Sequence, residues 1–198
     1  MSAILTTRDL VVGYDGTAVA TLADLTVAAG ERLVIRGANG SGKTTVLKTL
    51  AQLLAPVSGA MTGAPAGPGG AVYVHPAPFL FAGTGADNVL LGAHGRLDDA
   101  RRAIDALGAS AFAGMDVRAL SNGQRQRIAL ARALAARPIL LLVDEADTGL
   151  DAGALAQWRD ALAAHPQLAL VTASAGGEDT GGEDRRQKTE YRSVTLTS

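Results

Sequence analysis

The first part of the chain has the hydrophobic pattern of strands followed by a helix. Residues 4–12 and 18–27 alternate apolar and polar positions, and residues 13–16 separate them as a turn, which predicts short antiparallel strands. Residues 31–35 form an apolar strand that runs directly into a Gly-rich loop. Residues 44–54 then place their apolar side chains on one helical face, which predicts a helix.

The middle of the chain alternates helical and strand patterns. This alternation favours a mainly parallel sheet with right-handed crossovers. A stretch rich in Gly, Pro and Ala, residues 59–70, predicts a loop. The remaining predicted elements are helices at 97–107 and 123–136 and buried strands at 71–74, 139–143 and 168–172.

The end of the chain has a different composition. Residues 174–190 are polar, Gly-rich and heavily charged, which predicts a flexible stretch. Residues 191–197 are compatible with a final edge strand. We therefore expect one domain over residues 1–173 and a tail over residues 174–198.

Composition narrows the possible functions. The chain has 198 residues, of which 47% are hydrophobic and 19% charged, enough for one domain with a sizeable core. A net charge of -1 gives no reason to expect nucleic acid as a partner. The absence of cysteine excludes disulfides and thiolate metal sites and fits an intracellular setting. Residues 139–143 are too short an apolar run to span a bilayer, so a membrane function would need a separate membrane partner.

A phosphate-binding loop is the strongest chemical signal. The spacing Gly37-x4-Gly42-Lys43-Thr44 matches the phosphate-loop pattern in full and lies between a predicted strand and a predicted helix. Glycines let backbone N–H groups surround an anion, and the helix start attracts phosphate. A lysine there binds the β and γ phosphates, and a threonine hydroxyl binds Mg²⁺. The predicted nucleotide-binding residues are Gly37, Ala38, Asn39, Gly40, Ser41, Gly42, Lys43, Thr44 and Thr45, and the predicted ligand is ATP with Mg²⁺.

Two carboxylates follow the most apolar strand. Residues 139–143 lead directly into Asp144 and Glu145. Beside a phosphate loop, Asp144 is suited to hold Mg²⁺ together with Thr44, and Glu145 to act as general base toward water. The alternative is that both are solvated acids at a strand end without a chemical role, and the nearby phosphate loop favours the metal and general-base roles. We expect Glu145 and Lys43 to be catalytic residues.

Together with the segment Leu120-Ser121-Asn122-Gly123-Gln124, these motifs resemble the ATP-binding cassette (ABC) ATPase family. The resemblance extends over about residues 4–173. It implies an α/β P-loop NTPase fold with a mainly parallel core sheet, an N-terminal antiparallel β subdomain and a short helical insert at about residues 84–137. In the family the signature segment, here Ser121, Asn122, Gly123 and Gln124, contacts ATP held by a partner subunit. Asn122 replaces a glycine of the usual pattern.

Other segments resemble further family elements. Tyr14 lies where an aromatic residue stacks on adenine, although a surface tyrosine in a turn is the alternative. Residues 148–151 resemble a loop that communicates between subunits. Residues 79–84 with 87–89 resemble the segment that faces the membrane domain in transporters, with a buried aromatic cluster as the alternative.

The chain also departs from the family at two accessory positions. Pro76 stands where the family has a glutamine that reaches toward Mg²⁺ and the attacking water, with His75 beside it. Ala173 stands where the family has a histidine that senses the γ-phosphate. Since losing one group that stabilises the transition state costs ~10²–10³ in rate, we expect good ATP binding and slow hydrolysis.

The resemblance implies a subunit that works with other chains. We expect a dimer with a second ABC cassette, identical or not, that couples ATP binding and slow hydrolysis to transport by a separate transmembrane subunit. This would place the chain in the cytoplasm, peripherally on the membrane, without direct nucleic-acid binding. The alternatives are a soluble ABC ATPase acting on nucleic acid or ribosomes and a regulatory module with little turnover.

Overall fold

Two sheets organise the computed structural model, which describes residues 3–63, 66–145, 149–175 and 191–196. One sheet is antiparallel with the order β2-β1-β3, and β5 pairs with β1; the other is parallel with the order β6-β7-β8-β4-β9. The strands are β1 (Ala3–Tyr14), β2 (Thr17–Leu22), β3 (Leu25–Ala28), β4 (Arg32–Gly37), β5 (Ser58–Gly63), β6 (Ala71–Val74), β7 (Leu140–Asp144), β8 (Ala169–Ala175) and β9 (Arg192–Thr195). The helices are α1 (Lys43–Leu50), α2 (Gly85–Gly92), α3 (Leu97–Ala106), α4 (Asn122–Ala135) and α5 (Ala152–Ala163), with a short 3₁₀ turn at Val117–Ala119.

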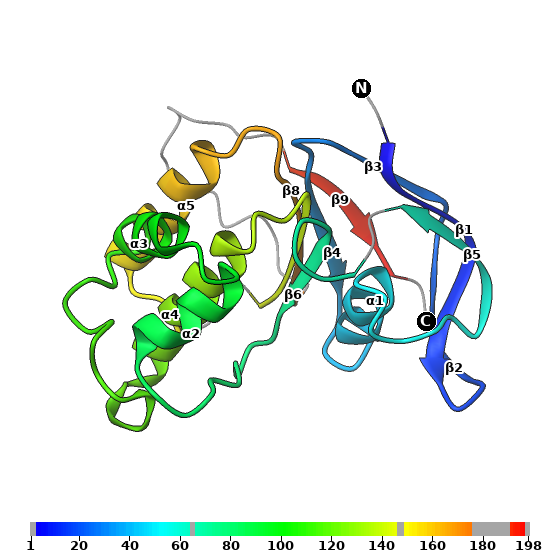
Figure 1. Ribbon diagram of the computed structural model, residues 1–198. Helices are drawn as coiled ribbons and strands as arrows, with labels where there is room; N and C mark the ends of the chain where they lie inside the picture. The colour runs from blue at the N-terminus through cyan, green and yellow to red at the C-terminus, as the bar shows by residue number, and fades with distance from the viewer. Residues whose placement is uncertain (1–2, 64–65, 146–148, 176–190, 197–198) are drawn as a thin grey trace.

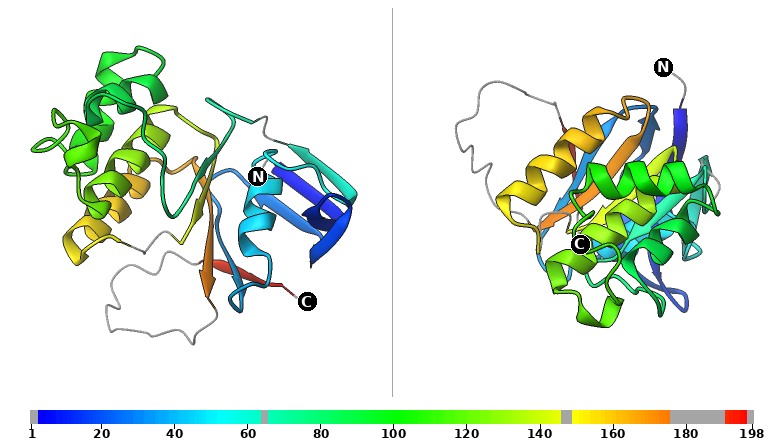
Figure 2. Two further views of the ribbon diagram at one scale, coloured as in Figure 1. Left: turned by 90° about the horizontal axis from the view of Figure 1, so that it is seen from below. Right: turned by 60° about the vertical axis from the view of Figure 1, so that its left-hand side comes forward.

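The parallel sheet separates two hydrophobic cores. Leu141 and Val143 of β7 belong to the core that contains α2 to α5, whereas Leu140 and Leu142 belong to the core that contains α1 and the antiparallel sheet. This division follows from the strand period of two residues, which sends successive side chains to opposite faces. Helix α1 therefore lies between the two sheets, and the other helices cover the far face of the parallel sheet (Figures 1 and 2).

Most predicted elements are present, but the strand segment predicted at residues 18–27 is divided into β2 and β3, and the helix predicted at residues 44–54 ends at Leu50. The predicted loop at residues 59–70 is wrong. Its first part is strand β5, which pairs with β1. Gly59 and Gly63 lie where β1 comes very close, since a Cβ at these positions would be 2.2 Å from the Asp9 carbonyl oxygen and 2.3 Å from the Ile4 carbonyl oxygen. The glycines that indicated a loop are therefore required by close contact between strands.

Helices α2 and α5 were not identified from the sequence. Helix α2 begins with a reciprocal capping box, in which the Thr84 side chain accepts from the Asp87 N–H and the Asp87 side chain accepts from the Thr84 N–H. Helix α5 is capped by Asp151, whose side chain accepts from the Ala154 N–H. The Thr-x-x-Asp spacing was the available signal for α2.

The last described strand lies at the edge of the parallel sheet. Strand β9 pairs with β4, the strand that leads into the phosphate loop. Arg192 forms an ion pair of 2.7 Å with Glu31, just before β4. Strand β8 continues to Ala175, past the predicted domain boundary, and residues 176–190 of the predicted tail lie outside the described residues.

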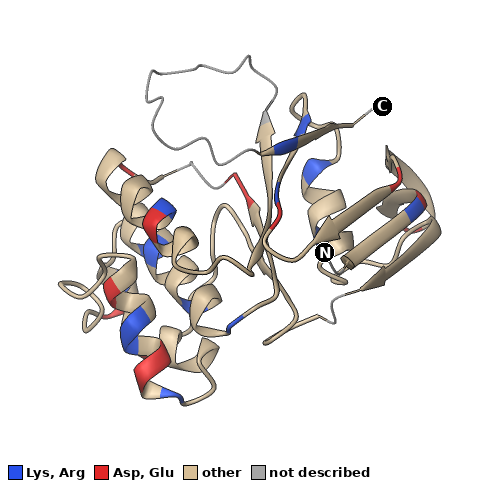
Figure 3. Cartoon of the chain, turned by 90° about the horizontal axis from the view of Figure 1, so that it is seen from above, with Lys and Arg blue, Asp and Glu red and all other residues tan. Residues whose placement is uncertain are grey.

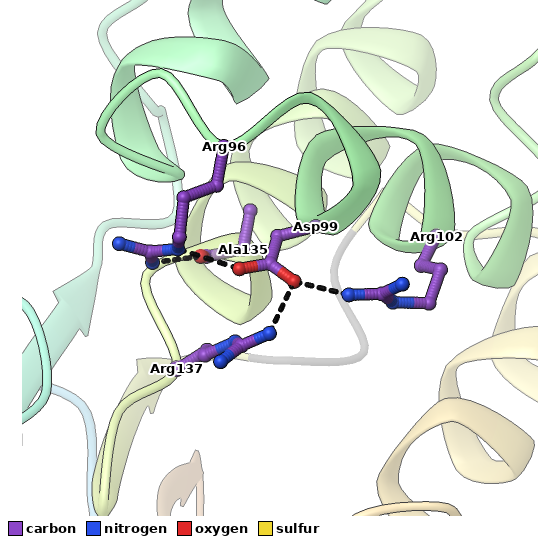
Figure 4. A network of polar contacts seen from close by, with 5 residues as sticks. All are labelled: Arg96, Asp99, Arg102, Ala135 and Arg137. Carbon is purple, nitrogen blue, oxygen red and sulfur yellow. Dashed lines mark hydrogen bonds and ion pairs between the residues drawn. The ribbon is translucent and has the colours of Figure 1, made fainter.

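A buried aspartate joins α3 to the end of α4 (Figure 4). Asp99 is 6% exposed and contacts three guanidinium groups, at 2.6 Å from both Arg96 and Arg137 and at short range from Arg102. Arg96 also donates to the Ala135 carbonyl oxygen at 3.2 Å. Hydrogen bonds from Arg96, then from Arg137 and Arg102, lower the pKa of Asp99 to about 2. Acidic and basic residues lie close together elsewhere in this helical layer too (Figure 3).

We expect Asp99→Asn to lower the melting temperature at pH 7, and this loss to shrink in acid. The folded pKa of about 2 lies below the unfolded value of ~3.9. The ionised carboxylate therefore stabilises the fold above about pH 4, and this contribution is lost as pH falls from about 4 to about 2. Thermal melts from pH 7 to pH 3 check this, with exposed Asp98→Asn as control. A deficit that stays constant over this range would contradict the assignment.

Candidate nucleotide site

The phosphate loop connects β4 to α1 and has the backbone of an anion site. Gly40 and Gly42 have φ angles of 82° and 89°, in the left-handed region that favours glycine. Gly42 is the N-cap of α1 and has no side chain to accept from the first N–H groups of the helix. A Cβ on Gly37 would lie 2.3 Å from the Ser41 hydroxyl oxygen, so the loop is tightly folded. The helix start is thus available for a phosphate.

Lys43 lies inside this loop. Its ammonium donates to the carbonyl oxygens of Gly37 and Ala38, both at 2.8 Å, and the residue is 7% exposed. These two contacts hold the positive charge within the curve of the loop. The charge is therefore placed where the phosphates of a nucleotide would lie.

Thr44 and Asp144 meet beside the loop. The Thr44 hydroxyl donates to Asp144 Oδ2 at 2.6 Å, although the two residues are 100 positions apart in sequence. Asp144 is 2% exposed at the end of β7, and the register pairs it with Ala173 of β8. The structure therefore brings together the two side chains that the sequence predicted to hold Mg²⁺.

The oxygen atoms of Thr44 and Asp144 are suited to bind a Mg²⁺ ion that arrives with a nucleotide. Within the part of the chain that the structure describes, no group of three or more His, Cys, Asp or Glu residues could hold a metal alone. Mg²⁺ prefers oxygen ligands and is commonly bound by one or two protein groups together with substrate phosphates. Thr44 and Asp144 supply such groups next to the phosphate loop.

Tyr73 also contacts Asp144, and the sequence reasoning missed it. Its hydroxyl donates to the same Asp144 Oδ2 at 3.0 Å from the neighbouring strand β6. Burial, followed by the Asp144 carboxylate, raises the pKa of Tyr73, so the hydroxyl remains protonated at neutral pH. The sequence predicted strands at residues 71–74 and 139–143 in a mainly parallel sheet, but it predicted neither their pairing nor the direction of the Tyr73 side chain.

Glu145 follows Asp144 at the point where the chain leaves β7. Its φ angle is 51°, a left-handed value that is uncommon for a residue other than glycine. The side chain is exposed, whereas Asp144 is buried. The two adjacent carboxylates therefore have different environments.

The hairpin of β1 and β2 contacts the end of the phosphate loop and the start of α1. Tyr14 is 45% exposed, and its hydroxyl accepts from the Thr45 hydroxyl at 3.4 Å. A Cβ on Gly42 would lie 2.8 Å from Ala20 Cβ and 3.0 Å from a Val19 methyl group. Tyr14 thus presents an accessible ring next to the start of α1, where an adenine partner is expected.

The loop after β6 provides little polar chemistry. His75 accepts from the Ala77 N–H through Nδ1 at 3.0 Å, and its ring meets the edge of Tyr73 with centroids 6.2 Å apart. Pro76 is half-buried and has no side-chain hydrogen-bonding group. The described contacts of His75 are therefore with its own loop and with Tyr73.

The predicted signature segment forms the start of α4. The Ser121 hydroxyl accepts from the Gln124 N–H at 3.3 Å, and Gln124 Oε1 accepts from the Ser121 N–H at 2.9 Å. Ser121 and Asn122 are exposed. Ser121 therefore caps α4, which packs on the opposite face of the parallel sheet from α1.

The signature helix contacts the loop that follows the acidic strand. A Cβ on Gly123 would lie 2.8 Å from the Gly149 carbonyl oxygen, so this position requires glycine in the observed packing. Arg127 of α4 forms an ion pair of 3.1 Å with Asp151, the cap of α5. Thr148, the first residue of the predicted communication loop, lies outside the described residues.

The aromatic segment before α2 is at the surface. Phe79 and Phe81 are 70% and 52% exposed, and their rings meet edge to face at 5.1 Å. Buried Asn88 holds this segment, because its side chain exchanges hydrogen bonds of 2.8 and 2.9 Å with the backbone of Phe81. Arg132 donates to the Phe79 carbonyl oxygen at 2.9 Å. Phe79, Phe81 and Arg132 line a cavity of about 500 Å³. Because both phenylalanine residues are more than half exposed, the alternative of a buried aromatic cluster is wrong.

Comparison with known proteins agrees with this arrangement. The model of the ABC transporter family matches residues 21–148, which is more than half of the chain. The chain belongs to the ABC transporter family. An ATP-binding protein for aliphatic sulfonates import from Burkholderia pseudomallei is 42% identical over 144 residues, covering 70% of this chain and 44% of the relative. A taurine import ATP-binding protein from Pseudomonas savastanoi is 40% identical over 164 residues, covering 75% of this chain and 62% of the relative.

Solved structures of ABC proteins have the same fold. A dimeric ATP-binding cassette bound to ADP and phosphate aligns with a TM-score of 0.74 at 21% identity, over 86% of this chain and 87% of that one. The predicted α/β P-loop fold is therefore confirmed. This ABC chain spans less than half the length of the first curated relatives that it matches. Its described helices include none that is both long and apolar enough to cross a membrane.

Proposed function

We propose that this chain is the ATPase subunit of an ABC transporter, which binds ATP with Mg²⁺ and hydrolyses it slowly. The observation that carries the proposal is the meeting of Thr44 and Asp144 beside a phosphate loop that surrounds Lys43. The names of the sulfonate and taurine relatives, both import ATP-binding proteins, support a transport role over action on nucleic acid.

Each residue of the site has a role that its geometry supports. Lys43 and the start of α1 bind the β and γ phosphates, and Tyr14 stacks on the adenine. Thr44 and Asp144 would hold Mg²⁺, and the ion would supply positive charge that neutralises the phosphates. Glu145, exposed beside the buried Asp144, takes the proton of the attacking water.

A second cassette completes this site. Ser121 caps a helix whose exposed start attracts anions, but this helix lies across the parallel sheet from the phosphate loop of the same chain. We propose that Ser121, Asn122, Gly123 and Gln124 contact ATP held by a partner cassette. The exposed Phe79 and Phe81 then form part of the surface that docks a separate transmembrane subunit, on the cytoplasmic side of the membrane.

We expect ATP to drive dimerisation of the Glu145→Gln variant, as measured by sedimentation velocity with Mg²⁺ present. Ser121→Asp should abolish dimerisation, because aspartate still caps the helix but repels the γ-phosphate of the partner site. Ser121→Thr keeps both the cap and the neutral charge and should still dimerise. If the variant binds ATP and remains monomeric, identical copies do not pair, and the site would then have to be completed by a different cassette. Equal dimerisation of Ser121→Asp would contradict the signature role.

A further inference from the structure

Asp144 is held by two donors from different parts of the fold. The Tyr73 hydroxyl donates to Asp144 Oδ2 at 3.0 Å from β6, and the Thr44 hydroxyl donates to the same oxygen at 2.6 Å from α1. Tyr73 pairs with Leu142 in the parallel register, so it stands on the neighbouring strand two positions before Asp144. The carboxylate is thereby fixed in one orientation with its other oxygen, Oδ1, outside these two contacts.

Tyr73 is the polar side chain that this part of the chain directs at Asp144. Between residues 71 and 78 the only side chains with hydrogen-bonding groups are Tyr73 and His75. The His75 Nδ1 atom is engaged by the Ala77 N–H, and Pro76 offers no polar group. Packing alone does not require a half-buried tyrosine to donate its hydroxyl hydrogen bond to a buried carboxylate, as Tyr73 does here.

We propose that Tyr73 is a positioning residue for the metal site: its hydroxyl orients the Asp144 carboxylate toward the Mg²⁺ that accompanies ATP. This inference rests on the proposed function. Tyr73 thus supplies a polar contact to Asp144 from strand β6, whereas Pro76 in the loop after β6 has no polar side chain to supply one. Removal of the hydroxyl leaves Thr44 as the single described hydrogen-bond donor to Asp144 Oδ2, and the carboxylate gains freedom to rotate.

The test measures metal affinity rather than turnover. Mn²⁺ replaces Mg²⁺ as the probe, and its binding to the full chain saturated with a non-hydrolysable ATP analogue is followed by electron paramagnetic resonance. We expect Tyr73→Phe to weaken Mn²⁺ binding by ~10-fold, the lower end of the range for partners of metal ligands. Tyr191→Phe is the matched control, because Tyr191 is an exposed tyrosine at the start of the final strand segment, and it should leave Mn²⁺ affinity unchanged.

A double-variant cycle separates positioning from a general effect on folding. In an Asp144→Asn background, Tyr73→Phe should cause no further loss of Mn²⁺ affinity, since the hydroxyl acts through the carboxylate. Binding of the nucleotide analogue without metal should be unchanged by Tyr73→Phe. Tyr73→Met, which also lacks the hydroxyl, should give the same loss and replaces Tyr73→Phe if circular dichroism shows that the latter is unfolded.

The outcomes distinguish this inference from the proposed function. If Asp144→Asn leaves Mn²⁺ affinity unchanged, the metal assignment itself is wrong, and both ideas fail. If Asp144→Asn weakens binding while Tyr73→Phe matches the original chain, only the Tyr73 inference is overturned. An equal loss from Tyr73→Phe with and without Asp144→Asn would also overturn it, because the tyrosine would then act independently of the carboxylate.

Discussion

The purified chain should bind ATP yet release phosphate slowly, and Pro76→Gln should raise its turnover by about tenfold or more. Pro76 is half-buried in the loop after β6, beside the strand whose Tyr73 reaches Asp144. A glutamine there would restore the side chain that, by the family resemblance, reaches toward Mg²⁺ and the attacking water. Since one group of this kind is typically worth ~10²–10³ in rate, partial recovery is expected while Ala173 remains.

Ala173 explains why recovery should be partial. The register pairs Ala173 directly with Asp144, so the position lies next to the proposed metal site. The residue is 4% exposed, and its methyl group packs in the core that contains α1. A large side chain at this position would have to displace core atoms, and for this reason the test changes Pro76 alone.

Steady-state phosphate release measures this effect. Pro78→Gln is the matched control, because Pro78 is a half-buried proline in the same loop and its replacement should leave turnover unchanged. Glu145→Gln should abolish whatever turnover each variant shows. Rapid hydrolysis by the original chain, lost in Glu145→Gln, would refute the expectation of slow turnover. A Pro76→Gln variant that binds ATP and still releases no phosphate would favour a regulatory module.

The parts of the molecule that were predictable depend on short-range patterns. The phosphate loop is a contiguous motif, and the left-handed Gly40 and Gly42 show why its glycines are needed. The apolar run at residues 139–143 predicted β7 because a strand buried on both faces is continuously apolar. The helix predicted at residues 123–136 is α4, and the capping box of Ser121 and Gln124 at its start depends on local chemistry of the same kind.

The features that were missed depend on contacts between distant segments. Strand β5 contains Gly59 and Gly63, which favour a loop in isolation and make sense only when β1 lies against them. Tyr73 and Asp144 are 71 positions apart, and their hydrogen bond depends on the parallel alignment of β6 and β7. Residue patterns gave the existence of both strands but not the direction of the tyrosine side chain.

Replacement of Lys43 should have the largest effect on ATP binding. Its ammonium is held within the loop by the carbonyl oxygens of Gly37 and Ala38, and it is the one lysine of the motif. Hydrogen bonds to charged groups contribute ~1.5–3 kcal/mol, so loss of the lysine contacts with the phosphates should weaken ATP binding by ~10–10² fold. Lys48→Ala is the matched control, since Lys48 lies in the last turn of the same helix.

Calorimetric titration of the chain with ATP and Mg²⁺ tests the nucleotide site most directly. We expect saturable binding of one ATP per chain, weakened by at least ~10-fold in Lys43→Ala and unchanged in Lys48→Ala. Failure of the original chain to bind ATP, or equal affinities for the original chain and Lys43→Ala, would contradict the assignment of the loop between β4 and α1 as the nucleotide site.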